Sequence, residues 1–273
     1  MANTPYEQLV RDFREGRIDR RDLFKRASAV GLSASAIGML LATGNIPAAL
    51  AAQEASPAAG GATVSDQLLV ASDEQTSTWT RNFNPLLPQG SSNRWPTING
   101  IYESLFIYTT INAEIVPWLA TEWSFNDDNT VLTFTTRDGV SWSDGTPFTA
   151  NDVAYTFNIF FENDAVPGNG GQVVAPFLES VEATDDSTVV FTFKQPYTIG
   201  LYDIGAQMIV PQHIFSEVDD LVIFTNEEPV GTGPFTNVAR FEQQVWELHR
   251  NENYWQEGKP YFQGFRIPAY PNN

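Results

Sequence analysis

Apolar and polar residues alternate with period two in several short stretches of this chain, which is typical of half-buried β-strands. Residues 131–136 alternate in this way. So do residues 179–183 and 188–194, on either side of the polar turn Asp185-Asp186-Ser187. A further apolar stretch, residues 68–71, predicts a short buried strand, and a helix is expected over residues 96–106. The pattern predicts a mixed α/β fold.

The densest run of structural signals lies in residues 137–157. Two aspartyl-glycine pairs, at 138–139 and 144–145, predict turns, with residues 140–143 as a returning strand between them. A helix is expected to follow, because Thr149 suits the N-cap and Asp152 stands three residues on, as in a capping box. One apolar face of this helix is predicted at helical spacing: Val153, Phe157, Phe160 and Phe161.

This order of elements resembles the family 5 extracellular solute-binding proteins, the peptide, nickel and oligosaccharide receptors of ABC importers. The matching residues are Trp142, Asp144, Gly145, Thr149 and Asp152. In one departure from the family pattern, Thr136 stands where an aliphatic residue is usual. The resemblance implies that these residues build the fold and bind no ligand themselves.

A second block similar to the family follows at residues 229–235 and 245–260, and the resemblance extends over residues 67–270. Its Gly231-x-Gly233 is a weak nucleotide-binding signal, because no third glycine follows and Pro234 does not open a helix. Family members trap ligand between two lobes and cross into the second lobe near residues 265–270. The resemblance therefore implies the first lobe of a two-lobed periplasmic-binding-protein-like fold, with the second lobe missing from this chain.

The N-terminal segment indicates export. Arg20 and Arg21 form a twin-arginine pattern, and residues 27–41 are apolar but too short for a stable membrane span. Ala49-Leu50-Ala51 suits signal cleavage. We predict a twin-arginine-type signal peptide over residues 1–51, a disordered linker over 52–66 that is rich in Ala, Ser, Pro and Gly, and an incomplete N-terminal lobe over 67–273.

Composition narrows the function further. The chain has no cysteine, so neither a cysteine-linked lipid anchor nor a disulfide is expected. Its formal net charge is −18, and the part after residue 51 is more acidic still, which argues against nucleic acid and anionic membranes as partners. We expect an exported monomer on the periplasmic or extracellular face of the membrane.

The family resemblance implies that the first strand enters the ligand cleft and that the following loop lines it. On this basis the predicted ligand-binding residues are Glu74, Trp79, Asn82, Asn84 and Tyr102. The expected ligand is a small peptide or an oligosaccharide, and the expected partner is an ABC transporter permease. An aromatic ring and side-chain amides suit a polar solute, since rings stack and amides form hydrogen bonds.

Catalysis and metal binding receive little support. The two histidines, His213 and His249, lack metal-ligand spacing, and cysteine is absent, so neither a metal site nor a cofactor is expected. Two carboxylates among Asp127, Asp144 and Glu103 could serve a glycosidase, but Asp144 is better explained by turn chemistry. The alternatives to a solute receptor are a secreted hydrolase and an inactive truncated receptor fragment.

Overall fold

The computed structural model describes residues 11–12, 17, 65–70, 79–87, 97–168 and 170–269. The chain divides into two units, Met1–Ala62 and Thr63–Asn273. Most of the predicted signal peptide, including Arg20 and Arg21, and most of the predicted linker lie outside the described residues. In the part of the chain that is described, no helix is both long and apolar enough to cross a membrane.

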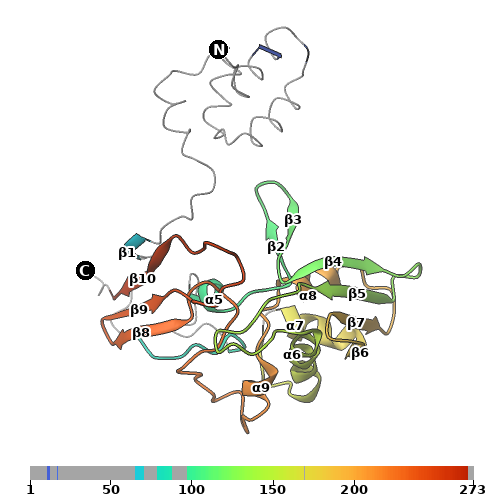
Figure 1. The fold of residues 1–273 in the computed structure, drawn as a ribbon. Helices are drawn as coiled ribbons and strands as arrows, with labels where there is room; N and C mark the ends of the chain where they lie inside the picture. The colour runs from blue at the N-terminus through green and yellow to red at the C-terminus, as the bar shows by residue number, and fades with distance from the viewer. Residues whose placement is uncertain are drawn as a thin grey trace. The chain divides into compact units, whose positions relative to one another are not determined.

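Three antiparallel or mixed sheets form the second unit (Figure 1). The strands are β1 (Ser65–Val70), β2 (Phe106–Thr109), β3 (Glu114–Pro117), β4 (Ala120–Phe125), β5 (Val131–Thr136), β6 (Leu178–Ala183), β7 (Thr188–Phe193), β8 (Asn237–Glu242), β9 (Val245–His249) and β10 (Phe262–Pro268). One sheet has the order β1-β10-β9-β8, another β4-β5-β7-β6, and β2 pairs with β3 alone. Only β1 and β10 run parallel; the other described strand pairs are antiparallel.

Among the described residues, the helices are short except for one. They are α5 (Thr97–Ile101), α6 (Ala150–Glu162), α7 (Gly170–Val174), the 3-10 turn η1 (Ala175–Phe177), α8 (Gly200–Ala206) and α9 (Gln212–Phe215). The longest, α6, packs on β6 and β7, while the β2–β3 hairpin projects from the body between the two larger sheets (Figure 1). The mixed α/β fold predicted from the hydrophobic pattern is confirmed.

The described residues of this unit include two separate apolar cores. The larger lies between α6 and the β4-β5-β7-β6 sheet, where the ring centroids of Phe157 and Phe191 are 4.9 Å apart. The smaller lies against the β1-β10-β9-β8 sheet and contains Trp79, Trp246 and Leu248. In β5 and β7 alternate side chains enter the core: β5 buries Leu132, Phe134 and Thr136, as its period-two pattern predicts.

The helix predicted after the two aspartyl-glycine turns is α6, with the expected capping box. The Thr149 hydroxyl oxygen accepts a hydrogen bond from the backbone N–H of Asn151 at 3.3 Å. In return the carboxylate of Asp152 accepts one from the backbone N–H of Thr149 at 2.9 Å. These reciprocal bonds satisfy backbone donors that the first helical turn leaves free, which is why the helix begins here.

Four local expectations need correction. Residues 140–143 form no returning strand, because both edges of β5 are already paired, with β4 and β7, and only a bridge from Ser141 to Pro147 remains. Helix α5 ends at Ile101, whose carbonyl oxygen accepts from Gly233, instead of reaching residue 106. Phe161 is 37% exposed in the last turn of α6. Finally, β1 begins at Ser65, inside the predicted linker.

The two sequence blocks that resemble the family meet in space. The backbone N–H of Ser143 donates to the carbonyl oxygen of Gly231 at 2.9 Å, and the side-chain amide of Asn253 donates to the carbonyl oxygen of Ser143 at 3.2 Å. Gly231 has no room for a side chain, because a Cβ there would lie 1.9 Å from the carbonyl oxygen of Ile101. Close backbone packing against α5 therefore explains why residue 231 is a glycine.

Candidate functional site

A cavity of about 470 Å³ opens where the end of α5, the base of the β2–β3 hairpin and the end of α8 come together. This volume falls within the usual range for sites that bind small molecules. Its lining is mostly aromatic or aliphatic, and consists of Asn99, Tyr102, Glu103, Ser104, Phe106, Ile107, Tyr108, Trp118, Ala206, Met208, Pro234 and Tyr254.

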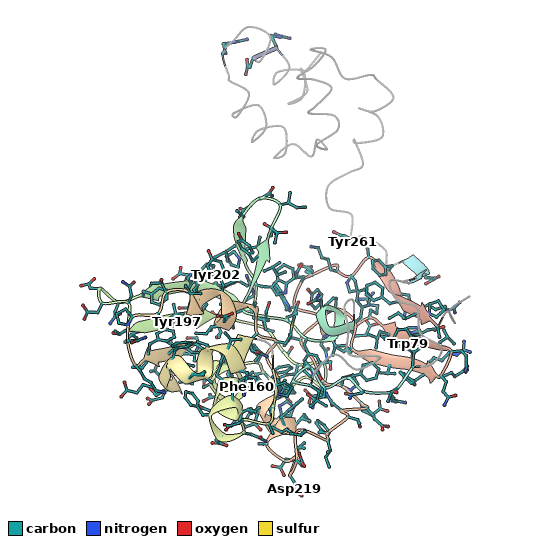
Figure 2. All side chains as sticks on the ribbon, turned by 180° about the vertical axis from the view of Figure 1, so that it is seen from behind. Trp79, Phe160, Tyr197, Tyr202, Asp219 and Tyr261 are labelled. Atoms are coloured by element: carbon teal, nitrogen blue, oxygen red, sulfur yellow. The ribbon has the colours of Figure 1, made fainter. Side chains whose placement is uncertain are left out.

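Exposed rings continue the cavity rim onto the surface. Tyr108 and Tyr202 are 43% and 47% exposed, and their ring centroids lie 5.4 Å apart in an edge-to-face arrangement. Tyr202 belongs to α8 and is labelled in Figure 2. Because exposed aromatic surface is costly in water, a rim of this kind favours contact with a ligand or another surface.

One buried carboxylate joins the back of the cavity. The side chain of Glu103 accepts hydrogen bonds from the indole N–H of Trp118 at 2.7 Å, the hydroxyl of Tyr254 at 3.0 Å and the indole N–H of Trp255 at 2.9 Å. We call these four residues the Glu103 cluster. Glu103 itself is only 5% exposed, so its carboxylate depends on these donors in place of water.

The electrostatics of the cluster follow from burial. Burial raises the pKa of Glu103, and the hydrogen bonds from Trp255 and Trp118 act in the opposite direction. Burial, followed by the nearby Glu103 carboxylate, also raises the pKa of the Tyr254 phenol. Tyr254 therefore remains a neutral hydroxyl donor at physiological pH.

Arg137 closes the cluster from behind. Its guanidinium carbon lies 4.7 Å from the centroid of the Trp255 ring, and its Nε donates to the carbonyl oxygen of Trp118 at 2.6 Å. Trp118 and Trp255 meet edge to face, with ring centroids 5.5 Å apart. The cation stacked on Trp255 and the backbone bond to Trp118 restrict both rings that donate to Glu103.

Of the four predicted ligand-binding residues that the structure describes, only Tyr102 lines the cavity. Its hydroxyl accepts a short hydrogen bond from the side-chain amide of Asn226. Burial raises the pKa of the Tyr102 phenol, and the Asn226 bond lowers it to a smaller extent. Because Tyr102 is only 1% exposed, it forms part of the buried wall of the cavity and offers no polar group to a ligand.

The other predicted contact residues lie elsewhere. Trp79 packs edge to face on Trp246, with centroids 5.9 Å apart, at the β8–β10 sheet and away from α8 (Figure 2). Asn84 is fully buried: its amide donates to the carbonyl oxygens of Leu221 and Phe224, and its side-chain oxygen accepts from the N–H of Leu86. These are structural contacts, so the ligand-binding role of Trp79 and Asn84 gains no support from this cavity.

Asn82 and Glu74 complete that set. The side-chain oxygen of Asn82 accepts from the backbone N–H of Asn84 at 3.0 Å, which makes a local turn at a half-buried position. Glu74 lies outside the described residues. Contact of either residue with a ligand stays a prediction.

The family-like residues of the 137–157 segment occupy structural positions. The Trp142 indole N–H donates to Asp152 at 3.3 Å, and both side chains are buried. Asp144 accepts from the backbone N–H of Thr146 at 2.9 Å and lies 2.7 Å from the Nε2 of His213. Gly145 has φ of +91°, a conformation that residues with a side chain rarely adopt.

Sequence reasoning missed the residues that shape the cavity most, namely Trp118, Met208 and Tyr254. Tyr254 lies in the second family-like block, but that block was interpreted only as a family marker. Trp118 follows the β2–β3 hairpin and is separated from Tyr254 by more than a hundred residues. A buried acid beside aromatic donors could have suggested the cluster, but nothing local in the sequence links the two segments.

The carboxylates considered for glycosidase chemistry are not arranged as a pair in the cavity. Glu103 is held by three donors, Asp144 belongs to a turn, and Asp127 is exposed in the turn between β4 and β5. Among the described residues, no group of three or more His, Asp or Glu side chains is placed to hold a metal ion.

A family model for bacterial extracellular solute-binding proteins, family 5 (middle region), matches residues 114–273, and the chain belongs to this family. Protein XP55 of Streptomyces lividans is 32% identical over 68% of this chain and 32% of its own length. A nickel-binding periplasmic protein of Escherichia coli K12 is 29% identical over 74% of this chain and 38% of its own length. The family consists of solute-binding receptors.

A solved structure agrees with the fold. The mannohexaose-bound periplasmic oligopeptide-binding protein of Thermotoga maritima superposes with a TM-score of 0.63 and 27% identity, over 74% of this chain and 38% of that chain. This chain thus spans 32% to 38% of the length of these relatives. That share is consistent with part of one lobe of a two-lobed binding protein.

Proposed function

We propose that this chain contributes to the extracytoplasmic solute-binding component of an ABC importer, which captures a small peptide or an oligosaccharide and delivers it to the permease. The observation that carries the proposal is the aromatic-lined cavity of about 470 Å³ in a member of family 5. A pocket of this size with a few fixed polar groups suits capture of a small solute.

The chemistry of the lining favours binding over catalysis. Tyr108, Trp118 and Tyr254 supply ring surface, which gains free energy by covering apolar faces of a solute, while the buried rings of Tyr102 and Phe106 pack behind them. Within the part of the chain that the structure describes, Glu103 is the only carboxylate of the lining, and it is committed to three donors. A hydrolase that uses two carboxylates would need a second one nearby, and so we propose a receptor and no enzyme.

The cellular setting is part of the same proposal. Arg20, Arg21, the apolar stretch that follows and Ala49-Leu50-Ala51 support export and cleavage near residue 51. We propose a periplasmic or extracellular monomer, held by no cysteine-linked lipid and without nucleic-acid partners, in keeping with its acidic charge. Replacing Arg20 and Arg21 by Lys should leave the uncleaved protein in the cytoplasm, and N-terminal sequencing of the exported form reads the outcome.

Ligand capture is tested by fluorine NMR on the chain labelled with fluorotryptophan. Trp118 lines the cavity, whereas Trp246 lies in the smaller core, so the two resonances report on the site and on the fold. Each is assigned by its Trp→Phe variant. This measurement detects millimolar affinities, so it remains informative if other parts of a receptor contribute to tight binding.

A short peptide or a manno-oligosaccharide should shift the Trp118 resonance in a saturable way and leave Trp246 unchanged. If no peptide or oligosaccharide shifts Trp118 at millimolar concentration, this cavity captures neither class of solute and the proposal is wrong. Equal shifts of both resonances would indicate a nonspecific effect on the fold and would also contradict it.

A further inference from the structure

The Glu103 cluster joins parts of the chain that are far apart. Trp118 is 15 residues from Glu103, while Tyr254 and Trp255 are 151 and 152 residues away. Trp118 follows β3, and the other two aromatic residues lie in the connection between β9 and β10. One carboxylate therefore joins the two cavity walls, together with the Trp118–Trp255 ring contact and Arg137 behind them.

The polar side-chain atom of each of the two wall residues bonds to this carboxylate. The Trp118 indole N–H and the Tyr254 hydroxyl both bond to Oε1 of Glu103. Trp255, which does not line the cavity, bonds to Oε2 and packs behind Trp118. Trp118 and Tyr254 therefore present ring surface to the cavity, and their side chains have no hydrogen-bond donor left for a ligand.

We propose that Glu103 is a positioning residue that fixes Trp118 and Tyr254 as a stacking wall, and that this wall receives an uncharged ring of the ligand. The inference rests on the proposed function, since it names the part of the solute that the cavity takes. The ring is either a hexose ring or an aromatic side chain of a peptide, because both present a C–H or π face that packs on aromatic rings.

Charge on the ligand is disfavoured at this wall. Among the described residues, the cavity lining contains no Lys, Arg, His or Asp, and both oxygens of Glu103, the one carboxylate found there, already accept hydrogen bonds. A charged group placed here would lose water without gaining a free partner of opposite charge. A neutral ring loses less hydration and gains contact area with Trp118 and Tyr254.

The test compares Glu103→Gln with wild type. Glutamine keeps the size of the side chain but replaces one acceptor oxygen by an NH2 donor, which faces the donors of the cluster. Glu247→Gln is the matched control: Glu247 is 7% exposed and bonds to Arg266 at 2.7 Å, but it lies on β9 away from the cavity lining. Tyr254→Phe is a second, milder variant that keeps the ring and removes only the hydroxyl.

Each fluorotryptophan-labelled protein is titrated with mannohexaose, Gly-Phe-Gly, Gly-Lys-Gly and Gly-Glu-Gly. In wild type, mannohexaose or Gly-Phe-Gly should shift the Trp118 resonance at lower concentration than either charged peptide does. Binding of mannohexaose would identify the ring as a hexose, and binding of Gly-Phe-Gly would identify it as an aromatic side chain of a peptide. Glu103→Gln should broaden or move the ligand-free Trp118 resonance and weaken binding of the ring ligand about tenfold, the effect of roughly one lost hydrogen-bond constraint. Tyr254→Phe should weaken it less.

The control should lower the melting temperature without changing Trp118 or the affinity. The inference is overturned if Glu103→Gln, or Tyr254→Phe where the former does not fold, leaves both the Trp118 resonance and the affinity as in wild type. It is also overturned if Gly-Lys-Gly binds more tightly than Gly-Phe-Gly. If no probe shifts Trp118 in wild type, the proposed function fails, while the ligand-free resonance of Glu103→Gln still decides whether Glu103 positions the wall.

Discussion

Asp152 and Glu103 are two buried carboxylates that each accept an indole N–H, yet their surroundings are built in different ways. Asp152 is bonded by Thr149 and Trp142, which are three and ten residues away. Glu103 is bonded by residues up to 152 positions away. The first is part of a local folding unit, and the second exists only when distant segments have already met.

The two carboxylates therefore have different roles, because Asp152 supports the fold and Glu103 supports the cavity wall. The Asp152 carboxylate starts α6 and, through the backbone N–H of Gln212 at 3.0 Å, anchors the start of α9. No ring that it holds lines the cavity. The Glu103 carboxylate holds two residues that do. Removing each acid in turn therefore separates loss of fold stability from loss of the cavity wall.

The largest effect is expected for Glu103→Ala. Three donors lose their acceptor in a buried place, and each unsatisfied donor costs roughly 1–3 kcal/mol, so we expect a destabilisation of about 3–5 kcal/mol. Urea unfolding followed by tryptophan fluorescence measures it. A change below about 1 kcal/mol would mean that water replaces the carboxylate, and the contrast with Asp152 would be lost.

Asp152→Ala should cost about 2 kcal/mol, because it removes half of the capping box together with the acceptor for Trp142 and Gln212. Thermal unfolding should move down, while the fluorine shift of Trp118 on ligand addition stays as in wild type. A selective loss of the ligand response at an unchanged melting temperature would place Asp152 in the site and contradict the comparison.

Gly145→Ala tests the local folding unit to which Asp152 belongs. A Cβ at this position meets no atom within 4 Å, so no clash is created and only the backbone conformation at φ of +91° opposes the substitution. We expect a loss of about 1 kcal/mol in the free energy of unfolding. Gly139→Ala is the matched control, since Gly139 also has open space and a φ of +74°. A neutral result at both would show that the turns adjust freely.

The smallest effect is expected for Asp144→Asn. Burial raises the pKa of Asp144, but the hydrogen bonds from Thr146 and His213 outweigh it, so the pKa is lowered overall. A carboxylate with a lower pKa in the folded state stabilises the fold above its unfolded pKa of about 3.9 and loses that contribution as pH falls through the folded value.

Wild type should therefore exceed Asp144→Asn by less than about 1 kcal/mol at neutral pH, a modest value for a partly exposed pair. The two proteins should converge as the pH falls below the folded pKa. Melting temperatures measured from neutral to strongly acidic pH decide this. A gap that widens toward acid would reverse the sign of the linkage.

The same contrast explains what could be predicted from sequence. Strands β5, β6 and β7 and the start of α6 were predicted because period-two alternation, an aspartate turn and a capping pair each act within a few residues. The prediction of a strand at 140–143 was wrong. Whether this segment can pair with β5 depends on the tertiary structure, in which β4 and β7 already occupy both edges of β5.

The cavity was beyond sequence reasoning for the same physical reason. Tyr102 was predicted through the family resemblance, but its neighbours Trp118 and Tyr254 are brought to it by packing between segments far apart in the chain. Trp79 looked like a ligand-stacking ring in a polar loop. The structure instead packs it on Trp246, which only the position of β9 decides.

The parallel pairing of β1 with β10 has a consequence for the order of folding. Strand β1 is the first described strand of the unit and β10 the last, and Leu69 pairs with Phe265 across nearly the whole domain. During synthesis β1 must wait, unpaired, until residue 268 has left the ribosome. The β4-β5-β7-β6 sheet has all its strands by residue 193 and can assemble earlier. We therefore expect the β4-β5-β7-β6 sheet to form before β1 pairs with β10.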